Sequence, residues 1–409
     1  MYTLLKENAN YLGKKAAEFT SELVRTPSLS LCENNVARMV EKKMDELGYD
    51  KVFVDDFGNV IGIIYGIESA PTVLLNSHMD TVSPDGENQV WEIPPYSGET
   101  RNGKLYGLGS SDCKSGLAMQ IYAGYLLKRA LLPLRGTLIV AATVSEENGL
   151  SLGVQHLISK TLADMKIKVD YAILGEPTGL GLFYGHDGWA EFRIGMDSPN
   201  PNFLHDAANA VFQNLLNASE VKGLPGYIEL MNVERPEFNR YSGDAYISFS
   251  RRLYHDDNAE ELKEKIKESG LQNVSREPGL NMKVMIREEA QKLQSGQTIQ
   301  VRYLSSAWET DPFSPLMDRS RQALSSAGCK TQPGKWLLPR LGMGTAGSIL
   351  TKRFNIPTIG YGPGTEEVAH SVKECVELDK ITEGLLGTAS IVHSLAGIPV
   401  FGWTSDMDI

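Results

Sequence analysis

At 409 residues the chain is long enough for two domains, because a single hydrophobic core stops growing at about 250–300 residues. Hydrophobic residues make up 42% of the sequence and charged residues 22%, which is typical of a soluble globular protein. The formal net charge of -11 argues against a nucleic-acid partner, because phosphate binding needs clustered Lys and Arg.

The start of the chain and its cysteines indicate a cytoplasmic protein. Residues 1–15 contain no apolar segment followed by a cleavage site, so no signal peptide is expected. No apolar stretch has the length of a membrane-spanning helix, and no membrane partner is expected. The cysteines form no Cys-x-x-Cys pair, which favours free thiols in a reducing compartment. They are Cys32, Cys113, Cys329 and Cys375.

The first part of the chain alternates helical and strand-like patterns. Helix candidates are residues 17–47, with a break at 26–28, and residues 117–129. Strand candidates are a pair within residues 52–65 and the apolar runs 72–76, 137–144 and 169–174. Strands that alternate with helices favour a largely parallel mixed sheet with helices on both faces. An α/β fold is therefore predicted.

Beyond Gly188 the pattern changes to that of a smaller domain with the ferredoxin-like order β-α-β-β-α-β. Its predicted elements are a strand at 190–196, a helix at 207–216, strands at 227–233 and 245–250, a helix at 259–269 and a strand at 282–286. The first pattern returns near Asp311, with a strand at 357–361 and a helix at 378–396. The sequence therefore predicts one α/β domain built from residues 1–188 and 307–409, and an inserted α+β domain at 189–306.

Polar clusters follow the predicted buried strands. Three strands run into His or carboxylate residues, which are His78 with Asp80, Glu146 with Glu147, and Glu176. Asp112 ends the Gly-rich turn 107–112, and His370 follows the late strand at 357–361. Because ligands of open α/β sheets bind beyond the carboxyl ends of the strands, we expect these side chains to converge at one edge.

Two imidazoles and three carboxylates suit a pair of zinc-type ions, each with an open position for water or substrate. The predicted ligands are His78, Asp112, Glu147, Glu176 and His370. Asp112 is able to bridge two ions about 3.5–4 Å apart. In an extended segment, residues two apart face the same side, so Asp80 is placed to orient His78. Glu146 faces differently from Glu147 and is expected to transfer protons.

The sequence resembles the co-catalytic zinc family of aminoacylase, acetylornithine deacetylase, succinyl-diaminopimelate desuccinylase and glutamate carboxypeptidase. The resemblance is carried, in the family's order, by LLNSHMDTV (74–82), NGKLYGLGSSDCKSG (102–116), VSEE (144–147), GEPT (175–178) and AHSVKECVE (369–377). It implies a discontinuous zinc-hydrolase domain and an inserted lid through which two copies dimerise. It also implies the five ligands named above, with Asp112 bridging, Glu146 as general base and acid, and Asp80 orienting His78. The chain is similar, too, to a subgroup of hydrolases linked to selenium metabolism.

The lid departs from the family's pattern at the residues that would contact substrate. Family members carry a His a few residues before a Pro and an Asn-Ala pair, and the equivalent position here is near Asn200. His205 is the nearest candidate to replace it, in a different register. The lid strand that often ends in Asp-x-Arg ends here in Ser250-Arg251-Arg252. These departures leave the predicted metal ligands intact.

Cys113 and the remaining histidines are expected to play no part in the chemistry. Cys113 lies beside Asp112, but no paired base indicates a nucleophile, and a ligand role is not expected either. Packing or surface roles are favoured for the other histidines, which are His156, His186, His255 and His393.

The sequence thus predicts a two-metal hydrolase that cleaves the C–N amide bond of a small N-acyl amino acid or related compound. A metal-bound hydroxide, activated by Glu146, attacks the carbonyl carbon, and Glu146 returns the proton to the leaving nitrogen. The expected cofactors are two divalent metal ions, zinc first with cobalt or manganese as alternatives. Two other functions stay open, a di- or tripeptidase or carboxypeptidase with the same metals, and a metal- or ligand-binding protein without turnover.

Overall fold

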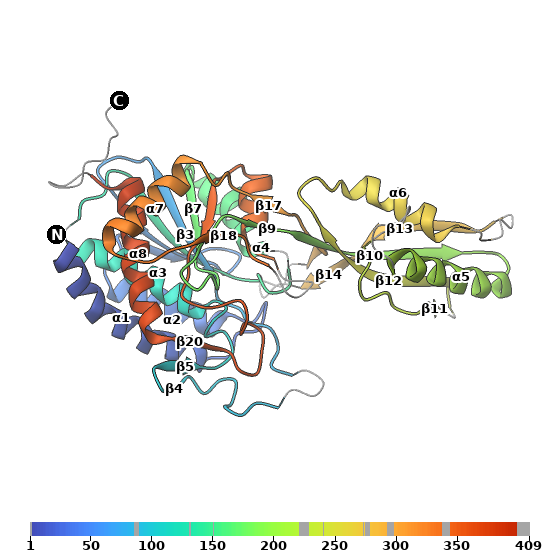
Figure 1. Cartoon of the computed structure of the whole chain (residues 1–409), viewed down its shortest axis with the longest axis horizontal. Coiled ribbons are helices and arrows are strands. Elements are labelled where there is room, and N and C mark those ends of the chain that lie inside the picture. The colour runs from blue at the N-terminus through green and yellow to red at the C-terminus, as the bar shows by residue number, and fades with distance from the viewer. Residues whose placement is uncertain are drawn as a thin grey trace.

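The structure, a computed structural model, has a larger part from which a narrower part projects (Figure 1). The residues that it describes are 2–85, 90–130, 132–149, 151–220, 229–239, 241–272, 274, 279–292, 298–337 and 344–398. Both ends of the described chain contribute to the larger part, as the blue and red elements of Figure 1 show. In these ranges no helix combines the length and the apolar character needed to cross a membrane.

An eight-stranded mixed sheet of order β1-β2-β6-β3-β7-β19-β8-β18 forms the centre of the larger part. Its strands are β1 (Lys51–Val54), β2 (Val60–Ile64), β3 (Thr72–His78), β6 (Thr137–Thr143), β7 (Tyr171–Leu174), β8 (Leu182–Phe183), β18 (Pro333–Gly334) and β19 (Thr358–Gly360). The neighbours β6, β3, β7 and β19 are parallel, which confirms the predicted sheet. Their carboxyl ends therefore lie at one edge.

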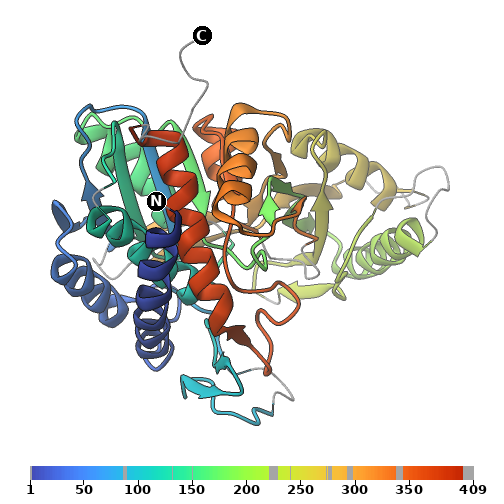
Figure 2. The same cartoon turned by 60° about the vertical axis from the view of Figure 1, so that its left-hand side comes forward.

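Helices cover both faces of this sheet because its central strands are apolar on both sides. Along β3, Val73 and Leu75 face one core, and Leu74 faces the other. The first core contains α1 (Tyr2–Val24), α2 (Asn34–Glu46), α3 (Lys114–Arg129), α7 (Pro315–Ala327) and α8 (Leu378–Ala396). The second contains α4 (Leu152–His156) and the π-helical turns η1 (Leu157–Leu162) and η2 (Ile349–Arg353). Figure 2 shows α8 alongside α1, so the two ends of the chain complete one core.

The projecting part is an insertion that runs from β10 to β16, residues 188–305. Its elements are β10 (Gly188–Asp197), α5 (Pro201–Glu220), β11 (Glu237–Asn239), β12 (Asp244–Leu253), α6 (Ala259–Gly270), β13 (Asn281–Ile286), β14 (Glu288–Lys292), β15 (Thr298–Arg302) and β16 (Leu304–Ser305). Its antiparallel sheet has the order β11-β12-β10-β13, and α5 and α6 pack on one face. Along β10, buried residues alternate with partly exposed ones, as expected for a sheet covered on one face. This is the predicted ferredoxin-like arrangement.

The insertion begins and ends at one place on the larger part. The strand β9 (Gly185–His186) precedes it, and β17 (Trp308–Glu309) follows it. The two strands pair antiparallel, with His186 opposite Trp308. The predicted domain boundaries at 188/189 and 306/307 lie beside this pair and stay a prediction.

Three expectations for individual elements were wrong or incomplete. The strand expected at 227–233 is absent over 229–233, where Met231 makes a single bridge to Ser250, and residues 227 and 228 lie outside the described ranges. A left-handed Asn232 (φ 53°) interrupts that segment, and β11 takes the strand's place. The first helix begins at Tyr2 rather than near residue 17. The polar hairpin β14–β15 was not predicted, since no apolar alternation marks it.

Candidate metal centre

The structure brings together all five predicted ligands beyond the carboxyl ends of the parallel strands. They form two groups that share Asp112. One group is His78, Asp112, Cys113 and Glu176, and the other is Asp112, Glu147 and His370. Within each group the donor atoms lie within 4.8 Å of one another. Two adjoining donor sets with one shared carboxylate are the arrangement that a two-metal site requires.

Asp112 lies between the two imidazoles. Its Oδ1 is 3.1 Å from Nε2 of His78, and its Oδ2 is 3.4 Å from Nε2 of His370. Each oxygen therefore faces a different group. The side chain is largely buried, so its position is set by the protein rather than by solvent.

Each imidazole also faces a second carboxylate. His78 Nε2 lies 3.9 Å from Glu176 Oε2, and His370 Nε2 lies 2.9 Å from Glu147 Oε2. Each group thus offers one imidazole nitrogen and oxygens from two carboxylates. Three protein donors with a position left open are typical of catalytic zinc.

The shifted pKa values of the buried carboxyl groups also indicate a site for cations. Burial, together with nearby carboxylates, raises the pKa of Glu146 to about 8 and that of Glu176 well above its usual value. Burial alone would raise the pKa of Asp112, but hydrogen bonds with His370 and His78 hold it below its usual range. Crowded, desolvated carboxylates are costly without positive charge between them. The donor set therefore suits two divalent ions.

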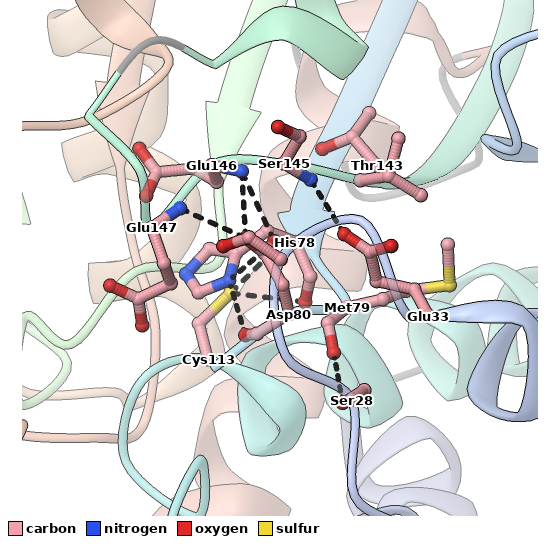
Figure 3. Close-up of polar contacts among 12 residues, drawn as sticks. Ser28, Glu33, His78, Met79, Asp80, Cys113, Thr143, Ser145, Glu146 and Glu147 are labelled. Atoms are coloured by element: carbon pink, nitrogen blue, oxygen red, sulfur yellow. Dashed lines mark hydrogen bonds and ion pairs between the residues drawn. The ribbon is translucent and has the colours of Figure 1, made fainter. Parts of the chain in front are cut away.

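Asp80 holds the loop that carries Glu146 and Glu147 (Figure 3). Its Oδ2 accepts the backbone N–H groups of Glu146 at 2.9 Å and Glu147 at 3.0 Å, and the hydroxyl of Ser30 at 2.7 Å. Nδ1 of His78 lies 2.9 Å from the backbone oxygen of Asp80 and 3.6 Å from its Oδ1. The Asp80 backbone is thus the nearer partner of the imidazole, whereas its carboxylate chiefly fixes the loop.

Glu146 lies beside the two groups without belonging to either. Its Oε1 accepts the hydroxyl of Ser151 at 3.1 Å, and its side chain is almost fully buried. The preceding Ser145 has a left-handed backbone (φ 58°), and its N–H is accepted by Glu33 at 2.9 Å. Glu33 and Ser151 were not found from the sequence, because neither belongs to a motif with metal-ligand spacing.

Cys113 is closer to the metal groups than the sequence indicated. Its Sγ accepts the backbone N–H of His78 at 3.2 Å. Burial raises the pKa of this thiol when no metal ion is bound, and a thiol is a weaker nucleophile than a thiolate. The expected absence of a chemical role stays a prediction.

The lid candidates lie apart from this centre in the described contacts. His205 is on α5 and stacks on Phe238 at a ring distance of 4.9 Å. Arg251 pairs with Asp257 at 3.3 Å within the insertion. His186 is buried at the base of the insertion, where Thr345 donates its N–H to Nε2 at 3.0 Å. The replacement of a lid histidine by His205 stays a prediction.

Known proteins resemble this chain in sequence and in fold. Residues 74–394 match the sequence profile of peptidase family M20/M25/M40. The uncharacterized protein YgeY of Escherichia coli (strain K12) is 27% identical over 398 residues, covering 91% of this chain and 92% of that protein. Succinyl-diaminopimelate desuccinylase 2 of Ruegeria sp. (strain TM1040) is 32% identical over 165 residues, or 40% of this chain and 41% of that protein.

Two solved structures show the same fold at low identity. The di-peptidase Dug1p from Saccharomyces cerevisiae superposes with a TM-score of 0.70 at 14% identity, covering 97% of this chain and 98% of that chain. Human carnosine dipeptidase 1 gives a TM-score of 0.68 at 15% identity, covering 96% and 98% of the two chains. Both likenesses extend over the larger part and the insertion.

Proposed function

Because the chain belongs to peptidase family M20/M25/M40, whose members are hydrolases that act on C–N bonds, we propose that it removes the acyl group from a small N-acyl amino acid or related compound. The observation that supports this proposal most strongly is the placement of Glu146. It is a buried carboxylate beside two candidate metal groups, is absent from both, and is held by Ser151. A site that only stored metal would have no need of such a group.

Different residues of the site have different functions in amide hydrolysis. Two divalent cations, when bound, supply Lewis acidity that polarises the substrate carbonyl and makes water acidic. His78, Asp112 and Glu176 would hold one cation, and Asp112, Glu147 and His370 the other. Glu146 accepts a proton from the attacking water and donates it to the leaving nitrogen, while Ser151 keeps its Oε1 in place. Asp80 holds the backbone of Glu146 and Glu147.

The proposal is tested by replacing Glu146 with Gln. Turnover should fall by about 10²–10⁴-fold, the usual contribution of a general acid–base, while the bound metal stays at the wild-type level. Glu147→Gln is the matched comparison, and it should lose metal as well as activity. Retained turnover in Glu146→Gln, with the metal in place, would remove Glu146 from the mechanism.

Peptide hydrolysis is the second candidate function. The matching family is named for peptidases, whereas the partial sequence match to a desuccinylase favours a deacylase. The zinc-loaded protein should therefore be offered N-succinyl and N-acetyl amino acids beside di- and tripeptides. A higher kcat/KM on the acylated amino acids supports our proposal, and a higher value on the peptides replaces it. Tight binding without turnover of any amide would favour the third function, a non-catalytic binding protein.

We further propose zinc as the metal and a homodimer formed through the insertion. Mixed imidazole and carboxylate donors are the ligands zinc takes in catalytic sites. The strands β11 and β13 are the edges of the insertion's sheet, and edge strands can pair with another chain. Metal analysis of the purified protein and sedimentation equilibrium test the two statements separately. The cytoplasmic location and the link to selenium metabolism stay predictions.

A further inference from the structure

Glu374 is a buried carboxylate that the proposed mechanism does not use. Its exposed fraction is 1%, and it belongs to neither metal group. Its Oε1 accepts three backbone N–H groups, those of Gly109 at 3.0 Å, Ser111 at 2.9 Å and Asp112 at 3.0 Å. No hydrogen-bond partner of Oε2 is found among the described residues. The single oxygen Oε1 of Glu374 therefore holds three backbone N–H groups at the end of the turn that carries Asp112.

The same turn is joined to the Glu374 segment at further points. The backbone oxygen of Glu374 accepts the N–H of Gly107 at 3.1 Å, where the turn begins. The hydroxyl of Ser111 donates to the carbonyl of Thr365 at 3.0 Å and accepts its N–H at 2.8 Å. The strand β20 (Cys375–Glu377), which follows Glu374, pairs with β5 (Lys104–Tyr106), which precedes the turn. Residues 104–112 and 365–377 therefore form one hydrogen-bonded unit.

This unit contains the donors on which both metal groups depend. Asp112 is shared by the two groups, and His370 lies four positions before Glu374 on the joined segment. If the three N–H groups lost their acceptor, Asp112 could turn or shift relative to both imidazoles. Partners that are hydrogen-bonded to metal-ligand side chains change metal affinity by about 10–100-fold when they are removed, and we expect a comparable effect for a partner that holds the ligand's backbone.

We propose that Glu374 is a positioning residue that fixes Asp112 between His78 and His370, and that it thereby controls the affinity of both metal positions. The proposal rests on the two-metal site proposed above. It follows from where the Oε1 acceptor lies, and the negative charge of Glu374 is not required. Two substitutions of Glu374 separate the effect of the acceptor's position from the effect of its charge.

The experiment measures the two Zn²⁺ dissociation constants by competition with a chelator. Glu374→Asp keeps the charge but withdraws the acceptor by one methylene, and it should weaken both positions by about 10–100-fold. Glu374→Gln keeps an oxygen acceptor at the same reach, and both affinities should stay close to those of the wild type. The matched control is Glu377→Gln on β20, an exposed carboxylate 3.8 Å from Lys104, which should change neither affinity.

The outcomes separate this proposal from the function on which it rests. A wild-type protein that binds no zinc contradicts the two-metal site itself. If the wild type binds two ions, unchanged affinities in Glu374→Asp contradict the positioning role, and so does a loss in Glu374→Gln that equals the loss in Glu374→Asp. Circular dichroism of each metal-free variant shows whether it is folded. Should Glu374→Asp not fold, Glu374→Gln decides alone, because reduced zinc affinity in that folded variant overturns the proposal.

Discussion

Ser151 holds Glu146, the proposed general acid–base, through one hydroxyl group. Its Oγ donates to Glu146 Oε1 at 3.1 Å, and hydrogen bonds to charged groups contribute about 1.5–3 kcal/mol. We expect Ser151→Ala to lower kcat by about tenfold or more, with little change in KM and in metal content. Steady-state kinetics measures this effect, on whichever of the N-acyl amino acids and peptides above is hydrolysed with the highest kcat/KM. Ser159→Ala, which removes an exposed helical hydroxyl bonded to Gln155, should leave kcat unchanged.

His186 makes stability sensitive to mild acid. Burial lowers its pKa to about 4, and Nε2 is occupied by the N–H of Thr345. Above about pH 6.5 the imidazole is neutral in the folded and unfolded states, so its full contribution to stability is present. As the pH falls from about 6.5 to about 4, the unfolded chain takes up the proton first, which lowers the free energy of unfolding by up to about 3 kcal/mol.

Urea unfolding at several pH values measures this loss. The variant His186→Gln should be less stable at neutral pH, because the ring stacks edge-on against Trp308 at 5.6 Å. Its free energy of unfolding should nevertheless fall less between about pH 6.5 and about pH 4 than that of the wild type. Equal slopes in the two proteins would exclude His186 as the cause.

At the level of residues, the sequence predicted which side chains meet, and among those that hold them it identified Asp80 but not Glu33, Ser151 or Glu374. His78, Asp112 and Glu147 could be found because they follow buried strands or a Gly-rich turn. Glu33 and Glu374 have the same chemistry, but their oxygens accept backbone N–H groups. Whether a carboxylate faces an imidazole or the main chain depends on long-range packing, which spacing along the sequence does not encode.

The loop after β6 depends on two separate carboxylates. Asp80 accepts the N–H groups of Glu146 and Glu147, and Glu33 accepts those of Ser145 and Leu31, both at 2.9 Å. We expect Glu33→Ala to destabilise the fold by about 1–3 kcal/mol, because a buried N–H group would lose its acceptor. Amide hydrogen exchange at Ser145 should become faster in this variant.

A matched substitution separates hydrogen bonding from charge in this loop. Glu33→Gln keeps the acceptor oxygen, so slow exchange at Ser145 should be retained. Burial and the nearby Asp80 raise the pKa of Glu33 to about 7, so the neutral amide is also electrostatically acceptable. Fast exchange in Glu33→Gln would show that the charge, and not the acceptor, holds the loop.

Helices and strands with a regular spacing of apolar residues were predicted well, and short polar strands were not. The bounds of α8 agree with the predicted helix at 378–396, since most of its buried side chains are apolar. The ferredoxin-like order of the insertion was also confirmed. By contrast, β4 (Glu99–Arg101) and β14 are exposed or half-exposed strands whose pairing comes from tertiary contacts. Propensity and alternation carry little information about such strands.

For the molecule as a whole, bound metal should contribute to the stability of the fold. In the metal-free protein, burial raises the pKa values of Glu147 and Glu176, so these groups keep their protons as the pH rises and resist ionisation. Their contribution to stability is therefore lost as the pH rises through the raised pKa values, unless cations balance the charge. Zinc should raise the melting temperature more at about pH 8 than at about pH 6.

Differential scanning calorimetry with and without a chelator measures this gain. At a free zinc concentration 100 times Kd, each occupied position adds about 2.7 kcal/mol to the free energy of unfolding. Glu146→Gln should show nearly the same gain, because Glu146 is outside both donor groups. A gain that falls with rising pH would contradict the assignment of carboxylate ligands.

The discontinuous larger part has a consequence for protein synthesis. When His186 has emerged from the ribosome, the strands β1 to β9 have already been synthesised. The helix α8, which packs against α1 and α3, has not. At about 5–20 residues per second, translating the insertion delays the next strand of the larger part by about 6–24 s. During that time the apolar faces of α1 and α3 that α8 covers in the finished fold are not yet covered by it. The insertion can fold during this delay, and the candidate metal centre is complete only after His370 has emerged from the ribosome.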